Sequence, residues 1–353
     1  ILATKLLTPP PRPNLVPRPR LLARLDEGLR PGQRLILVAA PAGFGKTTLV
    51  SAWLAGLGAD RAAAPAPRPI PGAADEGRGA VPAWLALDAA DNDPVRFLAY
   101  LVAALQQALP EAGRLVQEAL LGGPQAPPVE ALIAPLINDL AAAGRPLVMV
   151  LDDYQTITSP EVHRAVEFLL DHQPPQLHLV LLTRQEPPLP LARLRARGQV
   201  TQIGEQELRF TGGEAAAFLR ETMGLRLSDE ATAALAQRTE GGATGLQLAA
   251  LSWQEKSEDS GAFVVGFRGD NRYVMDYLVA EVVQRQPEEV QSFLCATSIL
   301  DRLTAPLCDA VVGQPGSQAL LEHLERANLF LVPLDQRREW YRYHRLFAEV
   351  LRS

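Results

Sequence analysis

The sequence predicts an α/β domain built on a parallel sheet, followed by a helical region and a small winged-helix domain. Short apolar runs alternate with helical segments up to about residue 205, and such runs are typical of strands buried on both faces of a parallel sheet. Beyond that point the alternation stops and helices follow one another. We therefore expect an α/β domain over 1–204, a helical domain over 205–286 and a winged-helix domain over 287–353.

Composition excludes several classes of protein. The 353 residues carry 34 basic and 40 acidic side chains, a net charge of −6, so bulk charge does not favour binding to polyanions. Hydrophobic residues make up 47% and charged residues 21%, as in ordinary globular proteins. Two cysteines are too few for a disulfide framework. No apolar run approaches the roughly 20 residues of a membrane span, and no secretory signal begins the chain. We expect a cytoplasmic protein with no membrane partner, and a fragment of a longer chain because it starts at Ile1 and stops abruptly at Ser353.

The first half of the α/β domain begins with a proline-rich arm. Six prolines in residues 1–20 remove backbone donors, which predicts an extended arm. A helix over 21–29, a strand over 34–39 and a helix over 47–57 follow. Residues 58–82 are dominated by alanine, proline and glycine without periodicity, which predicts a flexible insertion or, alternatively, a partner-binding loop.

The second half of this domain supplies the remaining strands. Pro94 suits the first turn of a helix that reaches about Ala108. The other expected elements are strands over 84–87, 146–151 and 177–182 and helices over 128–142 and 161–171.

The last 150 residues read as helices closed by a hairpin. Thr211 and Glu214 have the spacing of a capping box, which predicts a helical stretch from there to about Leu251. A polar connection over 254–272 follows. The expected later elements are helices over 274–284, 287–297, 304–312 and 317–327, strands over 329–334 and 339–343, and a final helix from His344. Helices followed by a two-stranded wing describe a winged helix.

The strongest motif is the loop from Ala40 to Thr48, which has the spacing of a phosphate-binding loop between a strand and a helix. Glycines there let backbone N–H groups face phosphate oxygens, and the helix N-terminus adds partial positive charge. Lys46 is placed to bridge the β- and γ-phosphates, and the Thr47 hydroxyl to bind Mg²⁺. The first glycine of the pattern is replaced by Ala40, which keeps the turn if its φ is negative. The candidate nucleotide-binding residues of the loop are Ala42, Gly43, Phe44, Gly45, Lys46, Thr47 and Thr48.

Acidic and basic residues follow two later strands. Asp152 and Asp153 come at the carboxyl end of an apolar strand, where open α/β sheets place ligands. Asp152 would hold Mg²⁺ and Asp153 would polarise the attacking water. Arg184 follows the next strand and would sense the γ-phosphate, or else it is a solvated arginine. One of three further arginines could act as an arginine finger, but we favour a solvated helix face for all of them: Arg193, Arg195 and Arg197.

His344 lies between Arg342 and Arg345 at the start of the final helix. It could reach phosphate oxygens if this domain folds back on a nucleotide, and it could equally be a packed histidine. Both interpretations stay open on the residues alone.

Taken together, these segments resemble the MalT-like signalling ATPases, large LuxR-type regulators within the STAND class of P-loop NTPases. The resemblance covers nearly the whole chain. It rests on TKLLTPPPRPNLVPRPRLLARL, APAGFGKTTL, WLALDAADNDPVRFLAYL, VLDDY, LLTRQEPPLPLARLRARGQV, LRFTGGEAAAFL, TEGGATGLQLAAL and WYRYHRLFAEVLR.

The resemblance assigns roles residue by residue. Val16 and Arg18 are similar to the adenine-binding segment, and Lys46 and Thr47 to the residues that bind phosphate and magnesium. The remaining roles that it implies are the acidic pair for Asp152 and Asp153, the sensor for Arg184 and a phosphate contact for His344. One departure is Gly242-Ala243, where the family usually has an aromatic residue and often a proline; this weakens the expected nucleotide contact from the helical domain.

The function implied by the resemblance is an ATP- or ADP-binding switch with Mg²⁺. Nucleotide and an inducer would control domain opening and self-association, and slow ATP hydrolysis would reset the switch. DNA binding would belong to a C-terminal helix-turn-helix outside this chain. The alternatives are a remodelling ATPase of the AAA type, acting on DNA or protein, and a small-molecule kinase, which the long helical tail disfavours.

Overall fold

The computed structural model describes residues 1–11, 14–58, 80–121, 128–225, 227–256, 272–327, 329–335 and 337–352. Contacts divide the chain into two compact units, which we describe separately. The first unit contains 1–12, 19–39 and 46–204, and the second contains 13–18, 40–45 and 205–353.

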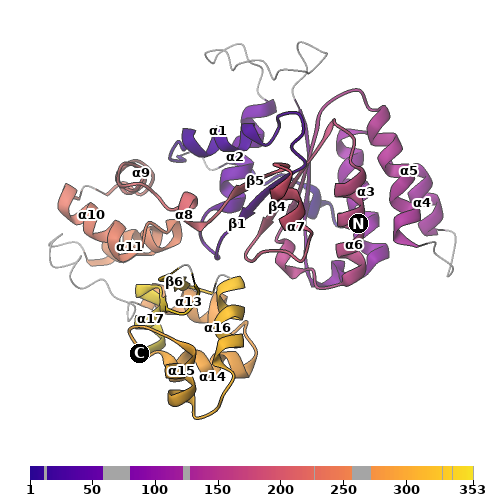
Figure 1. Cartoon of the computed structure of the whole chain (residues 1–353). Coiled ribbons are helices and arrows are strands. Elements are labelled where there is room, and N and C mark those ends of the chain that lie inside the picture. The colour runs from indigo at the N-terminus through magenta and orange to yellow at the C-terminus, as the bar shows by residue number, and fades with distance from the viewer. Residues whose placement is uncertain are drawn as a thin grey trace. The chain divides into compact units, whose positions relative to one another are not determined.

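The first unit is built on a five-stranded parallel sheet (Figure 1). Its strands lie in the order β2-β3-β4-β1-β5, and every neighbouring pair is parallel. The strands are β1 (Leu35–Ala39), β2 (Val81–Ala86), β3 (Leu147–Asp152), β4 (Leu177–Thr183) and β5 (Val200–Ile203). The predicted parallel sheet is confirmed, and β5 is a strand that the sequence did not reveal.

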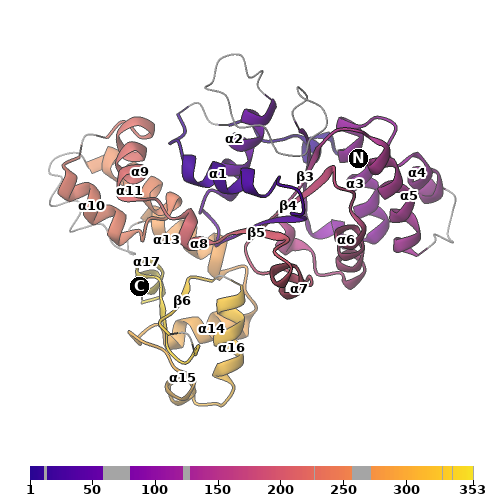
Figure 2. The same ribbon diagram turned by 45° about the horizontal axis from the view of Figure 1, so that its top comes forward.

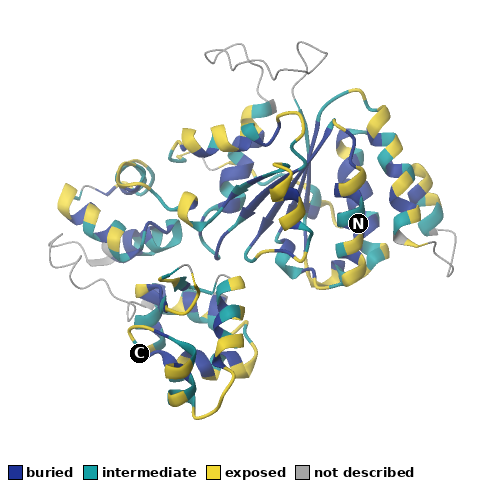
Figure 3. Ribbon diagram, in the orientation of Figure 1, coloured by how far each residue is buried: buried dark blue, intermediate teal, exposed yellow. Residues whose placement is uncertain are grey.

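Burial explains why these runs form strands. Every residue of β3 and β4 is buried, and the central strands are uniformly dark in Figure 3. Helices cover the sheet with their apolar faces, and α3 packs against β2. The helices are α1 (Pro19–Glu27), α2 (Lys46–Gly58), α3 (Pro94–Ala108), α4 (Arg114–Leu121), α5 (Val129–Ala142), α6 (Pro160–His172) and α7 (Leu191–Ala196). Pro94 occupies the first turn of α3, as predicted.

Strand register brings three strand ends to one edge. Ala39 of β1 lies opposite Thr183 of β4, and Asp152 of β3 lies opposite Ala86 of β2. Because all the strands are parallel, the residues that follow β1, β3 and β4 emerge at the same side of the sheet.

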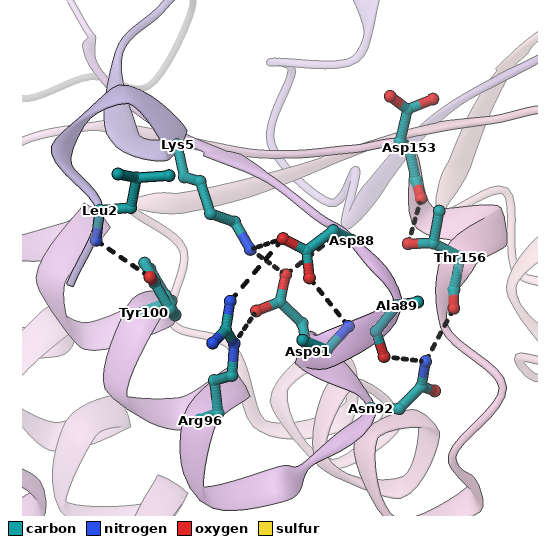
Figure 4. A network of polar contacts seen from close by, with 11 residues as sticks. Leu2, Lys5, Asp88, Ala89, Asp91, Asn92, Arg96, Tyr100, Asp153 and Thr156 are labelled. Carbon is teal, nitrogen blue, oxygen red and sulfur yellow. Dashed lines mark hydrogen bonds and ion pairs between the residues drawn. The ribbon is translucent and has the colours of Figure 1, made fainter.

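The N-terminal arm is not extended throughout, contrary to the prediction. Ala3–Leu6 forms a 3₁₀ helix, η1, and Pro19 already belongs to α1. The Lys5 ammonium is buried and donates to Asp88, 3.0 Å away, and to Asp91 (Figure 4). Asp91 is fully buried and also accepts a hydrogen bond from Arg96 Nε at 3.1 Å. This ionic network fixes η1, because a buried charge must be paired.

The second unit contains the helical segments and the wing. The helical stretch expected from Thr211 to Leu251 consists of several helices, because turns around Gly224 and Gly241, both with positive φ, divide it. The capping box between Thr211 and Glu214 is confirmed. The helices described before residue 257 are α8 (Glu205–Leu208), α9 (Gly212–Ala217), the π-helix η4 (Phe218–Thr222), α10 (Asp229–Arg238) and α11 (Ala243–Lys256).

The C-terminal part of this unit has the expected winged-helix elements. Helices α14 to α17 gather around a two-stranded antiparallel hairpin, as both views show (Figures 1 and 2). Tyr341 and Phe347 are fully buried in its core. The elements are α13 (Arg272–Leu278), the π-helix η5 (Val279–Val283), α14 (Glu288–Thr297), α15 (Ala305–Val312), α16 (Ser317–Arg326), β6 (Leu331–Pro333), β7 (Tyr341–Tyr343) and α17 (Arg345–Arg352).

Glu240 connects the helical and winged-helix parts of the second unit. It follows α10 with a φ of +48°, and its side chain is 10% exposed. Its carboxylate accepts two hydrogen bonds from Arg342, at 2.8 and 3.2 Å, and one from the backbone N–H of Arg345 at 3.1 Å. Arg209 adds an ion pair at 3.3 Å. We call this set the Glu240 cluster.

Two predicted connections fall largely outside the described residues. Of the insertion expected over 58–82, residues 59–79 are outside them, whereas Gly58 ends α2 and Val81 begins β2. Of the connection expected over 254–272, residues 257–271 are outside them. In the described part of the chain, helices are too short or too polar to cross a lipid bilayer.

Candidate phosphate-binding site

The loop between β1 and α2 has the backbone shape that a phosphate cradle requires. Gly43 and Gly45 have φ values of +82° and +76°, which only glycine adopts without strain. A Cβ on Gly43 would lie 2.4 Å from the Thr244 hydroxyl oxygen, so a side chain is excluded there on steric grounds as well. Ala40 is buried and is not among the residues with positive φ, so alanine fits the turn.

The first turn of α2 brings three candidate residues to the end of the loop. Lys46 is buried, and Thr47 and Thr48 are partly exposed. The Thr47 hydroxyl donates to Asp152 at the end of β3, with distances of 3.0 and 3.3 Å to the two carboxylate oxygens. The structure therefore brings together the two oxygen ligands that the sequence proposes for Mg²⁺.

The pKa values of two charged residues at this edge of the sheet, Asp152 and Lys46, are shifted in opposite directions. Burial raises the pKa of Asp152 to about 6, helped by the neighbouring charge of Asp153 and opposed by the Thr47 hydrogen bond. Burial and the Arg184 charge lower the pKa of Lys46 to about 8. A ligand that brings negative charge to Lys46 and positive charge to Asp152 would relieve both penalties, and a phosphate with a divalent cation has that character.

Asp153 has a constrained backbone. Its φ of +56° lies in the left-handed region, which is unusual for a residue other than glycine. Its backbone N–H donates to Asp152 at 2.9 Å, and its carbonyl accepts from the Thr156 hydroxyl at 2.9 Å. Asp153 is the residue directly before the short 3₁₀ helix η3 (Tyr154–Thr156). Backbone strain of this kind often accompanies a side chain that must point in a defined direction.

The arginines that follow β4 take different positions. Arg184 follows Thr183, the last residue of β4, and its charge acts on Lys46. Arg193 pairs with Asp171, and Arg195 pairs with Glu186 through exposed side chains. These surface pairs favour the solvated-face interpretation for the α7 arginines.

The arm around Arg18 has a structural contact that the sequence did not suggest. The buried Arg18 guanidinium donates to the carbonyls of Leu208 and Arg209, at 2.8 and 2.9 Å, and pairs with Glu214 at 3.3 Å. Its side chain is therefore engaged at the end of α8. Val16 is partly buried in the same segment.

His344 is a packed histidine that also faces the loop. It is 5% exposed and lines a cavity of about 40 Å³ together with Ala42, Gly43 and Phe44. Burial lowers the pKa of His344, and its Nδ1 has no hydrogen-bond partner within the described ranges. Burial thus shows a packed histidine, and the contact of His344 with phosphate stays a prediction.

Thr244 holds the loop from the first turn of α11. Its backbone N–H and its hydroxyl both donate to the carbonyl oxygen of Gly43, at 3.1 and 2.9 Å. Gly242 lies nearby, and a Cβ there would be 3.8 Å from the Phe44 ring. The stretch around Gly242-Ala243, where the family usually has an aromatic residue, therefore contacts the glycine loop itself.

The residues at the sheet edge fit a nucleotide with Mg²⁺. A hydroxyl and a carboxylate oxygen in contact are the hard ligands that Mg²⁺ prefers, and Mg²⁺ typically takes its other ligands from phosphate and water. Among the residues that the structure describes, acidic, histidine and cysteine side chains form no cluster of three or more that could hold a metal alone. Thr47 and Asp152 therefore suit a Mg²⁺ ion that takes its remaining ligands from the phosphates of a nucleotide and from water.

Sequence reasoning missed Gln155, Thr244 and Glu240. Gln155 contacts both Asp153 and the backbone of Arg184. The partners of Thr244 and Glu240 lie about 200 and 100 residues away in the chain. Glu240 and Thr244 lie in the segment TEGGATGLQLAAL that carries the resemblance, but no spacing pattern gives either of them, or Gln155, a role.

Comparisons with known proteins agree with this architecture. Residues 18–182 match the AAA ATPase domain, and residues 279–353 match the MalT winged helix domain. The HTH-type transcriptional regulator MalT of Serratia proteamaculans is 38% identical over 355 residues, and that of Klebsiella pneumoniae is 36% identical over 354. Each alignment covers the whole chain and 36% of the relative, so the chain spans about a third of the length of these relatives.

A solved structure shows the same fold. The Walker-type ATPase PABY2304 of Pyrococcus abyssi aligns over 98% of this chain and 99% of its own, with a TM-score of 0.63 and 17% identity. Over its whole length the chain is therefore similar to MalT regulators, and a segment that matches the AAA ATPase domain precedes one that matches the MalT winged helix domain.

Proposed function

We propose that the chain is the nucleotide-dependent switch of a transcriptional regulator, and that it binds ATP or ADP with Mg²⁺ and hydrolyses ATP slowly. The observation that carries this proposal is the Thr47–Asp152 contact at 3.0 Å, where Thr47 follows Lys46 in the chain directly after a loop with two positive-φ glycines. Chance glycine turns do not place a buried lysine, a hydroxyl and a strand-end carboxylate together.

Each residue has a role in this proposal. Backbone N–H groups from Gly43 to Thr48 bind the phosphates, and the Lys46 ammonium neutralises the β- and γ-phosphates. Thr47 and Asp152 would hold Mg²⁺, which stabilises charge on the phosphate oxygens. Asp153 orients and polarises the attacking water, and Arg184 contacts the γ-phosphate.

The regulatory part of the proposal concerns the second unit. Residues 42–44 of the loop share a cavity with His344, and Thr244 bonds the Gly43 carbonyl, which supports a coupling of phosphate occupancy to this unit. We propose that ADP favours a closed form because ADP binds that form with higher affinity than the open form.

Nucleotide binding can supply the free energy for such a switch, since a ligand at 100 times its dissociation constant stabilises the state it binds by about 2.7 kcal/mol. ATP with an inducer would then favour opening and self-association of a cytoplasmic regulator, and DNA contact would be made by segments outside this chain.

The binding proposal is tested by titrating the chain with fluorescent ATP and ADP in Mg²⁺. We expect Lys46→Ala to lower affinity at least about tenfold, the equivalent of one charge-assisted contact. Arg24→Ala removes an exposed cation of α1 that forms a surface ion pair with Glu27, and it should leave affinity unchanged. Equal affinities for the wild type and Lys46→Ala would end the site assignment.

The switch proposal has a separate measurement. Mass spectrometry of the denatured supernatant identifies any nucleotide retained on purification, and sedimentation compares the chain in ADP with the chain in a non-hydrolysable ATP analogue. We expect a compact, monomeric species in ADP. Identical sedimentation and identical proteolysis in the two nucleotides would argue against a switch while leaving nucleotide binding intact.

A further inference from the structure

Gln155 connects the acidic pair to the strand that carries Arg184. Its side-chain amide N–H donates to Asp153 Oδ1 at 2.7 Å, and its amide oxygen accepts from the backbone N–H of Arg184 at 2.9 Å. Gln155 lies in η3, directly after β3, and Arg184 directly follows β4, the neighbouring strand. One side chain thus joins the ends of two adjacent strands at the candidate site.

The side-chain amide of Gln155 matches the chemistry of both partners. A carboxylate oxygen only accepts, and a backbone N–H only donates, so the bridging group must offer one donor and one acceptor. The same requirement fixes the orientation of the amide. A glutamate would keep the bond to Arg184 and place a second acceptor against Asp153, whereas a leucine would remove both bonds.

The backbone around Asp153 is held independently of Gln155. Asn92, at the end of the 3₁₀ helix η2 (Ala89–Asn92), donates to the Thr156 carbonyl at 2.8 Å (Figure 4). Its side-chain oxygen accepts from the backbone N–H groups of Thr158 and Ser159, at 2.6 and 2.8 Å. With the turn anchored in this way, loss of the Gln155 amide should release the Asp153 carboxylate while the turn stays folded.

We propose that Gln155 is a positioning residue for ATP hydrolysis, which orients the Asp153 carboxylate and sets its distance from the Arg184 strand end. The inference rests on the proposed ATPase function. A displacement of the β4 end, where the γ-phosphate would be sensed, is transmitted through the amide to the group that would orient the attacking water. Phosphate binding itself uses Lys46 and Thr47, which the amide does not contact, so binding should be independent of Gln155.

The experiment compares kcat with nucleotide affinity in the full chain. We expect Gln155→Glu and Gln155→Leu to lower kcat roughly 10- to 100-fold, the cost of misplacing a catalytic group by about 1 Å. Their dissociation constants for ATP should stay within about threefold of the wild type, a difference worth less than one hydrogen bond. This separation between kcat and affinity is a signature that general unfolding does not produce.

A matched control is available on α3. The Gln106 amide also bridges two partners, the Ala112 carbonyl at 2.9 Å and the Gln117 amide at 3.0 Å, away from the sheet edge. Gln106→Leu should keep the wild-type kcat.

The outcomes separate the two proposals. If the wild type hydrolyses ATP and both Gln155 variants hydrolyse it equally fast, the positioning role is overturned and the ATPase function stands. Equal losses in kcat and affinity, or an equal loss in Gln106→Leu, also overturn it. A wild-type chain that binds nucleotide without hydrolysis overturns both proposals.

Discussion

Glu240→Gln is the substitution with the most definite expected effect on stability. Burial alone would raise the pKa of Glu240, but the Arg342 hydrogen bonds outweigh burial and hold the pKa at about 2, below its ordinary 4.5. That difference corresponds to about 3 kcal/mol. Because solvent reaches part of the Glu240 cluster, we reduce the expected loss to about 2 kcal/mol. The amide keeps the size of the side chain, so the loss measures charge and hydrogen bonding.

The sign of the pH dependence follows from the lowered pKa. A carboxylate with a depressed pKa in the folded state contributes stability that is complete above about pH 4.5 and is lost as the pH falls toward 2. The wild type should therefore lose its advantage over Glu240→Gln in that interval, and the two proteins should converge at its acid end.

Hydrogen exchange of the amides in β7 and α17 gives the measurement. A local loss of about 2 kcal/mol should accelerate exchange roughly 30-fold at neutral pH. Glu322→Gln, on α16 in the same unit, removes a carboxylate that accepts a surface hydrogen bond from Gln318, and it should change exchange little. If Glu240→Gln and Glu322→Gln exchange alike, the reasoning from the Glu240 cluster is refuted.

Three further expectations follow from the sites described above. Lys46, with its pKa lowered to about 8, should take up a proton when triphosphate binds at pH 8, so the binding enthalpy should depend on the buffer; a buffer-independent enthalpy contradicts this. Gly43→Ala should lower the unfolding temperature more than Gly32→Ala, because both have positive φ but only Gly43 lacks space for a Cβ; equal shifts contradict the steric part. Lys5→Met should cost about 3 kcal/mol in urea unfolding by leaving Asp91 buried with one partner fewer, and adding Asp91→Asn should recover part of it; a neutral Lys5→Met would show that the pair is dispensable.

Local patterns predicted the parts of the fold that depend on burial at both faces. The runs that became β1, β3 and β4 are continuous and apolar, so their strand character is visible in the sequence. Strand β5 has four residues, with Thr201 and Gln202 in the middle, and such a short mixed run carries no strand signal. The 3₁₀ turn at Lys5 was missed because its partners lie more than 80 residues away.

In the candidate site, too, local patterns predicted some contacts, whereas contacts between distant segments were visible only in the structure. Loop spacing and the position of acids after a strand predicted that Lys46, Thr47 and Asp152 meet, because parallel strands end at one edge. Contacts between distant segments were not predictable. Gln155 and Glu240 are ordinary polar residues in the sequence, and only the packing of neighbouring strands and helices gives them partners.

The two hydrogen bonds from Thr244 to the Gly43 carbonyl limit how far this chain can be shortened without loss of nucleotide binding. The peptide that would cradle phosphate is stabilised in part by a residue 201 positions later in the chain. A truncation that ends before α11 would leave the glycine loop without that support, so an isolated sheet domain should bind nucleotide less well than the longer chain even though every residue of the loop motif is retained.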